Sequence, residues 1–196
     1  MHRLGMIVLL GALTLSSYSW GGEQKQSGKS ELQKNPVVVM ETNQGIMEIE
    51  LLFNAAPNTA KNFLDLVKKK FYDGLTFHRI VAGFVIQGGD PQGDGMGGPG
   101  YSIKDEKSVQ PQVRGTLGMA KSGPNTAGSQ FYINLKDNSF LDKQDFCGFA
   151  KVVKGMEVAD QIAKLPVGQN DKPKEKVLII KAYVKNSPPE VKTGQK

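Results

Sequence analysis

An arginine lies among apolar residues in the middle of the chain, within Phe77-His78-Arg79-Ile80-Val81-Ala82-Gly83-Phe84-Val85-Ile86-Gln87-Gly88-Gly89-Asp90. Arg79 stays protonated at any ordinary pH, and its guanidinium carries five N–H donors that need acceptors. The apolar side chains around it supply none. The pattern is typical of an apolar cleft with two polar groups, Arg79 and Gln87, and a peptide is one candidate ligand.

A second stretch, Gly118-Met119-Ala120-Lys121-Ser122-Gly123-Pro124-Asn125-Thr126-Ala127-Gly128-Ser129-Gln130-Phe131-Tyr132-Ile133, is punctuated by glycines and ends in an amide and two aromatic residues. Taken together, the two stretches resemble the cyclophilin family of peptidyl-prolyl isomerases, and the resemblance runs from about Val37 to Val184. It implies a mainly β fold, a closed eight-stranded antiparallel barrel with a helix covering each end. It also implies peptidyl-prolyl cis-trans isomerase activity without a cofactor.

The resemblance places Arg79 at the position of the family's catalytic arginine. A peptide bond before proline rotates over a barrier of about 18 to 20 kcal/mol, because twisting destroys its conjugation. The nitrogen lone pair of the twisted bond is localised and basic, so a guanidinium aimed at it binds the twisted state more tightly than the planar states. From residue type alone, an arginine paired with a carboxylate at the barrel rim is the favoured interpretation.

Four apolar residues are expected to hold the proline ring, although apolar side chains by default belong to the core. The resemblance implies that Phe84 forms the floor of a proline pocket and that Tyr132 stands in place of a phenylalanine wall. Val85 lies where many members carry methionine, which narrows the apolar contact. Leu141 completes the predicted pocket.

Four further residues are expected to align the substrate backbone. Gln87 and Gln130 match two family glutamines near the substrate, although each can equally satisfy buried main chain. Ala120 and Lys121 fall where members present main-chain groups to an extended peptide. Lys121 replaces a common asparagine, which a largely main-chain contact should tolerate.

Two departures from the family pattern favour an alternative function, a proline-peptide binding module or chaperone with little turnover. Phe140 occupies the position often held by tryptophan and has no N–H. Because the family's indole donates a hydrogen bond to cyclosporin, we expect weak inhibition by that drug. Phe146 corresponds to a pocket histidine of many members, next to a one-residue insertion in 143–145. Proline isomerisation needs no proton transfer, so this loss should not remove activity.

The remaining groups that could do chemistry have structural interpretations. His78 has no nucleophile beside it, so a Ser or Cys mechanism is not indicated. Cys147, the single cysteine, is interpreted as a small buried apolar residue. A zinc site is not expected, because the chain has so few histidine and cysteine ligands. The stretch 93–98 satisfies G-x-G-x-x-G, but Pro99 and Gly100 follow where a helix should begin, so a surface turn is favoured over dinucleotide binding.

The ends of the chain differ from its middle. In residues 1–19, His2 and Arg3 precede an apolar run from Leu4 to Leu15 that is too short to cross a bilayer comfortably, which predicts a cleaved signal peptide and a periplasmic or secreted protein. The alternative is an uncleaved membrane anchor. Residues 20–34 read as a flexible linker, 35–185 as one isomerase domain and 186–196 as a loose tail.

Charge and composition indicate which classes of binding partner are expected. The net charge is +6 and the lysines are scattered without interleaved aromatic residues, so a solvated surface is favoured over a nucleic-acid track. The expected partners are proline-containing unfolded or extended polypeptides. No stable membrane insertion is expected once the signal is cleaved, and a monomer is expected.

Hydrophobic spacing places the elements that must position these residues. Val37–Glu41 and Ile46–Leu52 flank a turn and predict a hairpin. A helix should begin at Pro57, and a second should run over Met156–Lys164. Further strands are predicted at Thr76–Ile80, Val85–Gln87, Thr116–Met119, Gln130–Asn134, Phe146–Val153 and Val177–Val184. Periodicity alone does not choose between a sandwich and a barrel.

Overall fold

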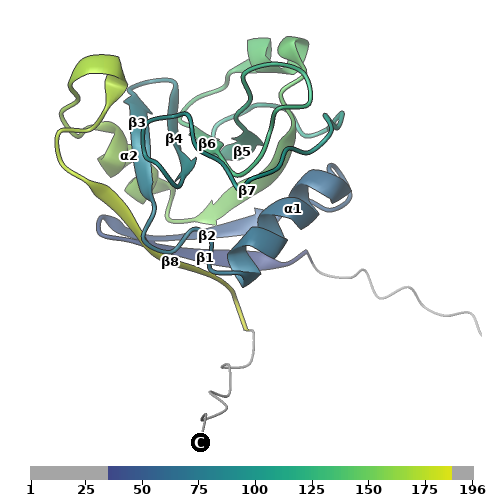
Figure 1. The fold of residues 1–196 in the computed structure, drawn as a ribbon, viewed down its shortest axis with the longest axis horizontal. Helices are drawn as coiled ribbons and strands as arrows, with labels where there is room; N and C mark the ends of the chain where they lie inside the picture. The colour runs from purple at the N-terminus through teal and green to yellow at the C-terminus, as the bar shows by residue number, and fades with distance from the viewer. Residues whose placement is uncertain (1–34, 187–196) are drawn as a thin grey trace, which may run out of the picture. The chain divides into compact units, whose positions relative to one another are not determined.

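Residues 35–186 are described by a computed structural model, in which eight antiparallel strands form a closed barrel (Figure 1). The order around the barrel is β1-β2-β7-β5-β6-β4-β3-β8, and β8 pairs with β1 to close it. The predicted closed barrel is therefore confirmed. The predicted signal peptide, the linker and the tail beyond residue 186 lie outside the described residues. The strands are β1 (Val37–Thr42), β2 (Gly45–Leu51), β3 (Thr76–Val81), β4 (Val85–Asp90), β5 (Thr116–Met119), β6 (Phe131–Asn134), β7 (Gly148–Lys154) and β8 (Val177–Val184).

The first two strands form the predicted hairpin. Thr42 pairs with Gly45 across a two-residue turn, and the Thr42 hydroxyl donates to the Gly45 carbonyl at 2.8 Å. Gly45 has a φ of 137°, a conformation that L side chains rarely adopt, so glycine suits this turn. The Asn43 side chain bonds the main chain of Lys176 and Leu178, which fastens the turn to the loop before β8 and to the strand itself.

Two α-helices pack against the strands. Helix α1 (Pro57–Lys68) begins at the predicted proline and buries an apolar stripe that includes Phe63 and Val67. Helix α2 (Met156–Ala163) ends one residue before the predicted Lys164. Helix α1 contacts β7 and β8, whereas α2 contacts β2, β3 and β4. Neither helix in the described part of the chain is long and apolar enough to cross a membrane.

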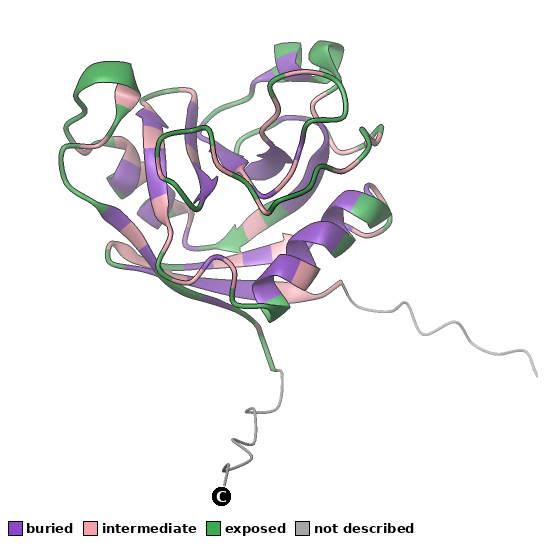
Figure 2. Ribbon diagram, in the orientation of Figure 1, coloured by how far each residue is buried: buried purple, intermediate pink, exposed green. Residues whose placement is uncertain are grey.

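Five aromatic side chains form the centre of the core. The ring of Phe63 on α1 lies 4.9 to 5.5 Å from those of Tyr72, Phe131 and Phe149, in tilted and edge-on arrangements. Phe77 meets Phe131 edge to face at 5.8 Å. Such pairs add to the stability that area burial alone supplies. Figure 2 shows buried residues along the strands and on α1, with most exposed residues in the loops.

Two strand boundaries differ from the predicted ones by more than one residue. Strand β4 continues past Gln87 to Asp90, because Asp90 pairs with Thr76. Strand β7 begins at Gly148 rather than Phe146, because Asp145 takes a left-handed conformation with a φ of 56° that ends the preceding 3₁₀ helix. Cys147 therefore precedes the strand. It is buried, and burial raises the pKa of its thiol, which confirms the structural interpretation of this cysteine.

The glycine-rich stretch 93–98 forms a loop held by one carboxylate. Asp90 is buried and accepts the main-chain N–H groups of Gln92, Asp94 and Gly95. Burial alone would raise the pKa of Asp90, but these three hydrogen bonds outweigh it and lower the pKa. No helix follows the loop in residues 99–102, so the dinucleotide-binding interpretation lacks its helix N-terminus and is wrong.

His78 lies buried next to this loop, at a register shift between β3 and β4. A Cβ on Gly95 would lie 4.0 Å from the His78 Nε2. Burial lowers the pKa of His78. The negative charge of Asp90 opposes this shift, and the positive charge of Arg79 adds to it. Within the described residues neither ring nitrogen has a hydrogen-bond partner, so His78 acts as a neutral packed ring.

His78 predicts a loss of stability between neutral pH and pH 5.5. Its folded pKa lies below the unfolded value of about 6.5, so the unfolded chain binds more protons as the pH falls, with a slope of at most about 1.4 kcal/mol per pH unit. Urea unfolding at pH 7.5 and 5.5 should show this loss in the wild type and a smaller one in His78→Gln. Equal losses in the two proteins would contradict the assignment; His2 is present in both and cancels.

Candidate active site

A charged side chain, an amide and an aromatic ring form a row on the outward face of the barrel wall. Arg79 on β3 pairs with Gln87 on β4, and Gln87 pairs with Tyr132 on β6. Directly opposite residues of antiparallel strands share one face of the sheet. The alternate residues Ile86 and Ile133 belong to the buried core, so Arg79, Gln87 and Tyr132 face outward. We call these three residues the outer row.

Arg79 has a carboxylate partner and is also accessible. Its Nη2 lies 3.2 Å from Oδ2 of Asp171, and 39% of its side-chain surface remains exposed. The arginine–carboxylate pair expected from residue type alone is therefore present. The guanidinium nevertheless remains accessible to solvent. A guanidinium carries five N–H donors, so one contact to a carboxylate leaves donors for a substrate.

An apolar cluster adjoins the outer row. Three of its side chains, Val85, Tyr132 and Leu141, are buried, and three more pack against them. Leu141 belongs to the 3₁₀ helix η1 (Ser139–Gln144), which follows β6. Phe140 on the same helix is half-exposed and stacks on one member of the cluster, Phe84, at 5.7 Å. The structure thus brings the four predicted proline-pocket residues together. The cluster consists of Phe84, Val85, Ala120, Tyr132, Leu141 and Phe146.

Tyr132 is held in place from two sides. Its ring lies against Gly118, where an added Cβ would overlap the tyrosine hydroxyl and ring, so only glycine fits there. Its hydroxyl donates to Oε1 of Gln112 at 3.0 Å. Burial raises the pKa of Tyr132, which keeps the hydroxyl protonated as a donor. The extra oxygen of tyrosine, relative to phenylalanine, thus has a specific partner.

Gln112 is a residue of the site that sequence reasoning missed. It is fully buried and accepts a second hydrogen bond from Asn134 at 2.8 Å. Its main-chain N–H donates to Asp142, its side-chain amide donates to the Phe146 carbonyl, and its own carbonyl accepts from the N–H of Asn138. Gln112 therefore fastens η1 and Phe146 to the barrel. No local pattern in the sequence marks this loop glutamine.

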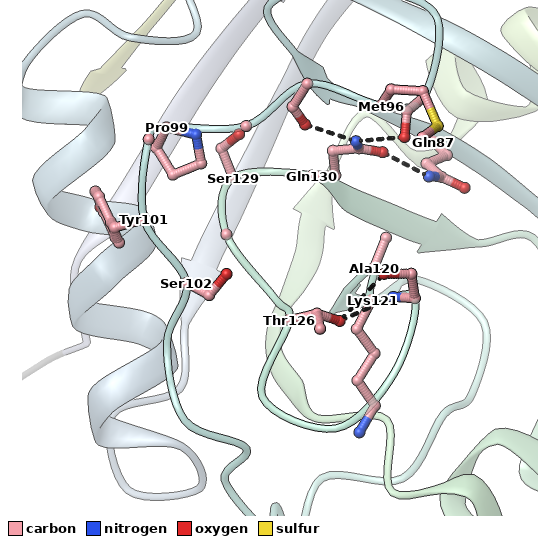
Figure 3. Close-up of a pocket in the computed structure, with 16 residues that line it drawn as sticks. Gln87, Met96, Pro99, Tyr101, Ser102, Ala120, Lys121, Thr126, Ser129 and Gln130 are labelled. Atoms are coloured by element: carbon pink, nitrogen blue, oxygen red, sulfur yellow. Dashed lines mark hydrogen bonds between the residues drawn. The ribbon is translucent and has the colours of Figure 1, made fainter.

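The two predicted glutamines contact each other, and one of them also contacts the glycine-rich loop. Gln87 Nε2 donates to Gln130 Oε1 at 3.0 Å, and Gln130 Nε2 donates to the carbonyls of Gly95 and Gly97 at 2.9 and 2.8 Å (Figure 3). The Gln130 amide thus satisfies main chain, as the alternative interpretation expected. By doing so it fixes the loop beside the outer row.

A hollow of about 540 Å³ opens between this loop and the segment after β5. In Figure 3, Gln87 and Gln130 lie at one end, with Ala120 and Lys121 below them. The Ala120 N–H donates to the Gln130 carbonyl at 2.9 Å, which ties the two walls together. The hollow is lined by Gln87, Ala120–Ser122, Thr126, Gly128–Gln130 and the loop residues 95–102.

Lys121 is not the solvated lysine that the scattered charge predicted. Its ammonium lies 2.8 Å from Asp105 and 5.6 Å from the centre of the Phe146 ring, and only 11% of its side chain is exposed. The hydrogen bond from Lys121 lowers the pKa of Asp105. The side chain is therefore anchored. Phe146, at the predicted histidine position, meets Tyr132 edge to face at 6.0 Å.

The described part of the chain contains no cluster of side chains suited to a metal ion. Among residues 35–186, no three His, Cys, Asp or Glu side chains are grouped so as to hold a metal ion. The chemistry that the geometry offers is a permanent positive charge beside a partly buried apolar surface. Such a site can bind an apolar ring and place hydrogen-bond donors next to it.

Comparison with known proteins agrees with this geometry. Residues 37–184 match the family model for cyclophilin type peptidyl-prolyl cis-trans isomerases. A peptidyl-prolyl cis-trans isomerase-like 1 protein of Neurospora crassa is 43% identical over 152 residues, which cover 75% of this chain and 93% of that protein. A peptidyl-prolyl cis-trans isomerase of Acinetobacter baylyi is 36% identical over 198 residues, covering 91% of this chain and 94% of the relative.

Solved structures show the same fold. A cyclophilin type isomerase of Cryptosporidium parvum, crystallised in the presence of the dipeptide Ala-Pro, is 33% identical with a TM-score of 0.72. The match covers 77% of this chain and 99% of that one. By its sequence and its barrel alike, the chain belongs to the cyclophilin family of peptidyl-prolyl cis-trans isomerases.

Proposed function

We propose that this isomerase accelerates rotation about Xaa-Pro bonds by stabilising the twisted amide with Arg79. The observation that carries the proposal is the outer row, in which the half-exposed guanidinium shares one face of the barrel with Gln87 and Tyr132. The proline ring packs on the apolar cluster. The prolyl nitrogen then lies within reach of the guanidinium, which donates to its lone pair as the bond twists.

The proposed mechanism moves no proton. A guanidinium remains charged throughout, and its donation to the nitrogen strengthens only when conjugation is lost. The site therefore works without the histidine that many family members carry, here replaced by Phe146. His78 takes no part, because its ring is buried and its pKa is lowered by burial.

The substrate backbone is proposed to run from the apolar cluster into the hollow. Gln87 lines that hollow, and Ala120 and Lys121 form its edge with their main chain. The side chain of Lys121 is anchored to Asp105 and stays out of the path. A substrate that places its proline on the cluster and the adjacent residue in the hollow must be extended. The site therefore suits unfolded or extended polypeptides.

A binding module or chaperone with little turnover is the alternative. The loss of the family tryptophan at Phe140 and of the histidine at Phe146 favours it, because both change the surface that holds a ligand. Arg79 discriminates between the two functions. A binder has no use for a donor aimed at a nitrogen that becomes basic only when the bond twists.

We also propose that the protein is exported and acts, as a monomer, on exported chains during folding. The support is the sequence of residues 1–19, with a basic start and a short apolar run. Uncatalysed proline isomerisation takes tens of seconds or longer, so an exported isomerase would speed the folding of its clients. The scattered lysines offer no track for nucleic acid.

Arg79→Ala should lower the rate of isomerisation by on the order of 10² or more, because it removes a donor that acts on the transition state. NMR exchange spectroscopy on the tetrapeptide Ala-Ala-Pro-Phe measures this rate for both proteins. Circular dichroism and thermal unfolding serve as controls for the fold. Equal exchange rates would refute the catalytic role and leave the binding module as the better account.

Phe140→Trp should strengthen cyclosporin binding by about 2- to 10-fold, the value of one neutral hydrogen bond, because it restores an indole N–H. Titration calorimetry measures the two dissociation constants. Phe140→Leu, which also lacks a donor, should show no such gain. Nanomolar affinity in the wild type would show that the indole is dispensable here.

Export predicts that the mature protein begins near Trp20. N-terminal sequencing of protein recovered from the periplasm of a bacterial host would test this, with Leu10→Arg as a control that breaks the apolar run and should block export. Mature protein that retains residues 1–19 in the membrane fraction would instead support the uncleaved anchor.

A further inference from the structure

The partner of Arg79 comes from a distant part of the chain. Asp171 ends the short 3₁₀ segment η2 (Gln169–Asp171), which lies between α2 and β8. This segment contacts β3, the strand that carries Arg79. Nothing in the local sequence of 169–171 connects it with the outer row, so the pairing exists only in the folded barrel.

Main-chain hydrogen bonds join the two ends of the loop that carries Asp171. The Gly168 N–H donates to the Lys172 carbonyl at 2.8 Å, and Val167 bridges to Pro173. The Lys172 N–H in turn donates to the Gln169 carbonyl. A loop closed in this way holds its tip in one place, which an ion pair with a long, mobile arginine side chain requires.

The backbone at the tip is unusual. Asn170 and Asp171 have φ values of 58° and 59°, the left-handed region that most side chains avoid. The pair that this conformation makes possible is exposed at both ends, and exposed ion pairs contribute little to stability. Asn and Asp are the side chains that enter this region most readily, so the sequence of the tip suits its conformation, while stability does not account for the pair that Asp171 makes.

We propose that Asp171 is a positioning residue that orients the guanidinium of Arg79 toward the prolyl nitrogen; this inference rests on the proposed catalytic role of Arg79. An arginine side chain has several rotatable bonds, and a donor stabilises a transition state best when it is already aligned. Asp171 contacts Nη2 and so restricts the orientation of the whole planar group. A guanidinium has further N–H donors beyond the one in this contact, and these serve the substrate.

Asp171 could have the opposite effect on the rate, so the direction of the rate change decides between two roles. A carboxylate that held Arg79 away from the substrate would act as a brake, and removing its charge would raise the rate. A positioning residue predicts a fall. The two cases differ in the sign of one measurement.

Asp171→Asn tests the inference with little change to the loop, because asparagine accepts the left-handed conformation as readily as aspartate does. NMR line-shape analysis of titrations with Ala-Ala-Pro-Phe gives the dissociation constant and the exchange rate of the bound peptide separately. We expect the bound exchange rate to fall about 3- to 10-fold and the dissociation constant to change less than twofold. An unchanged or higher rate would overturn the inference.

Asp160→Asn is the matched control. Asp160 pairs with Arg114 at 2.7 Å, and the side-chain exposures of that pair, 43% and 39%, mirror those of Arg79 and Asp171. The substitution weakens an ion pair of similar exposure, made through two hydrogen bonds, that includes no residue of the outer row. The bound exchange rate should stay at the wild-type value.

A double-mutant cycle separates this inference from the proposed function. In an Arg79→Ala background, Asp171→Asn should have no further effect, because it acts only through the guanidinium. An equal fall in both backgrounds would show a structural role and overturn the inference. If Arg79→Ala itself keeps the wild-type rate, the proposed function fails; if it loses activity while Asp171→Asn does not, only the positioning role fails.

Discussion

The site depends on the register between β3, β4 and β6. Neighbouring strands lie about 4.8 Å apart, so paired residues present their side chains at short, regular intervals on one face. The pairs Arg79 with Gln87 and Gln87 with Tyr132 set a charge, an amide and an aromatic ring side by side. A slip of one residue would turn each side chain to the other face and bury the charge. Closure of the barrel, which leaves no free edge, makes such a slip costly.

Close contacts with neighbouring residues hold Tyr132, one member of the outer row, in place, and they leave little room for substitutions. Glycine at position 118 gives the Tyr132 ring room on the neighbouring strand. The Gln112 side chain, fully buried, takes hydrogen bonds from both Tyr132 and Asn134. A buried amide left without partners costs much more than one hydrogen bond contributes, so such a network specifies one arrangement. The proposed proline-binding surface is thereby supported by side chains, Gln112 and Asn134, that are themselves buried.

The changes at Phe140 and Phe146 alter the apolar surface and leave the charged centre in place. Phe140 stacks on Phe84, and Phe146 packs on Tyr132 while its ring faces the Lys121 ammonium. Both therefore add apolar contact where the family often has an N–H donor. Ligands that need such a donor lose a partner, whereas a proline ring does not. In the proposed mechanism, the apolar surface holds the proline ring and the charge of Arg79 stabilises the twisted bond.

The amino-acid sequence by itself determined the elements and the family. The Thr42–Gly45 turn, the helix that begins at Pro57 and the strand at Thr116–Met119 follow from local conformational preferences and apolar spacing, which act over a few residues. The motif around Arg79 and Tyr132 indicated the candidate site through family resemblance. Only the tertiary structure decided that Gln112 supports Tyr132, that Gln130 holds the glycine-rich loop and that Asp171 meets Arg79. These contacts join residues distant in sequence, and their partners are chosen by barrel closure, which no local pattern records.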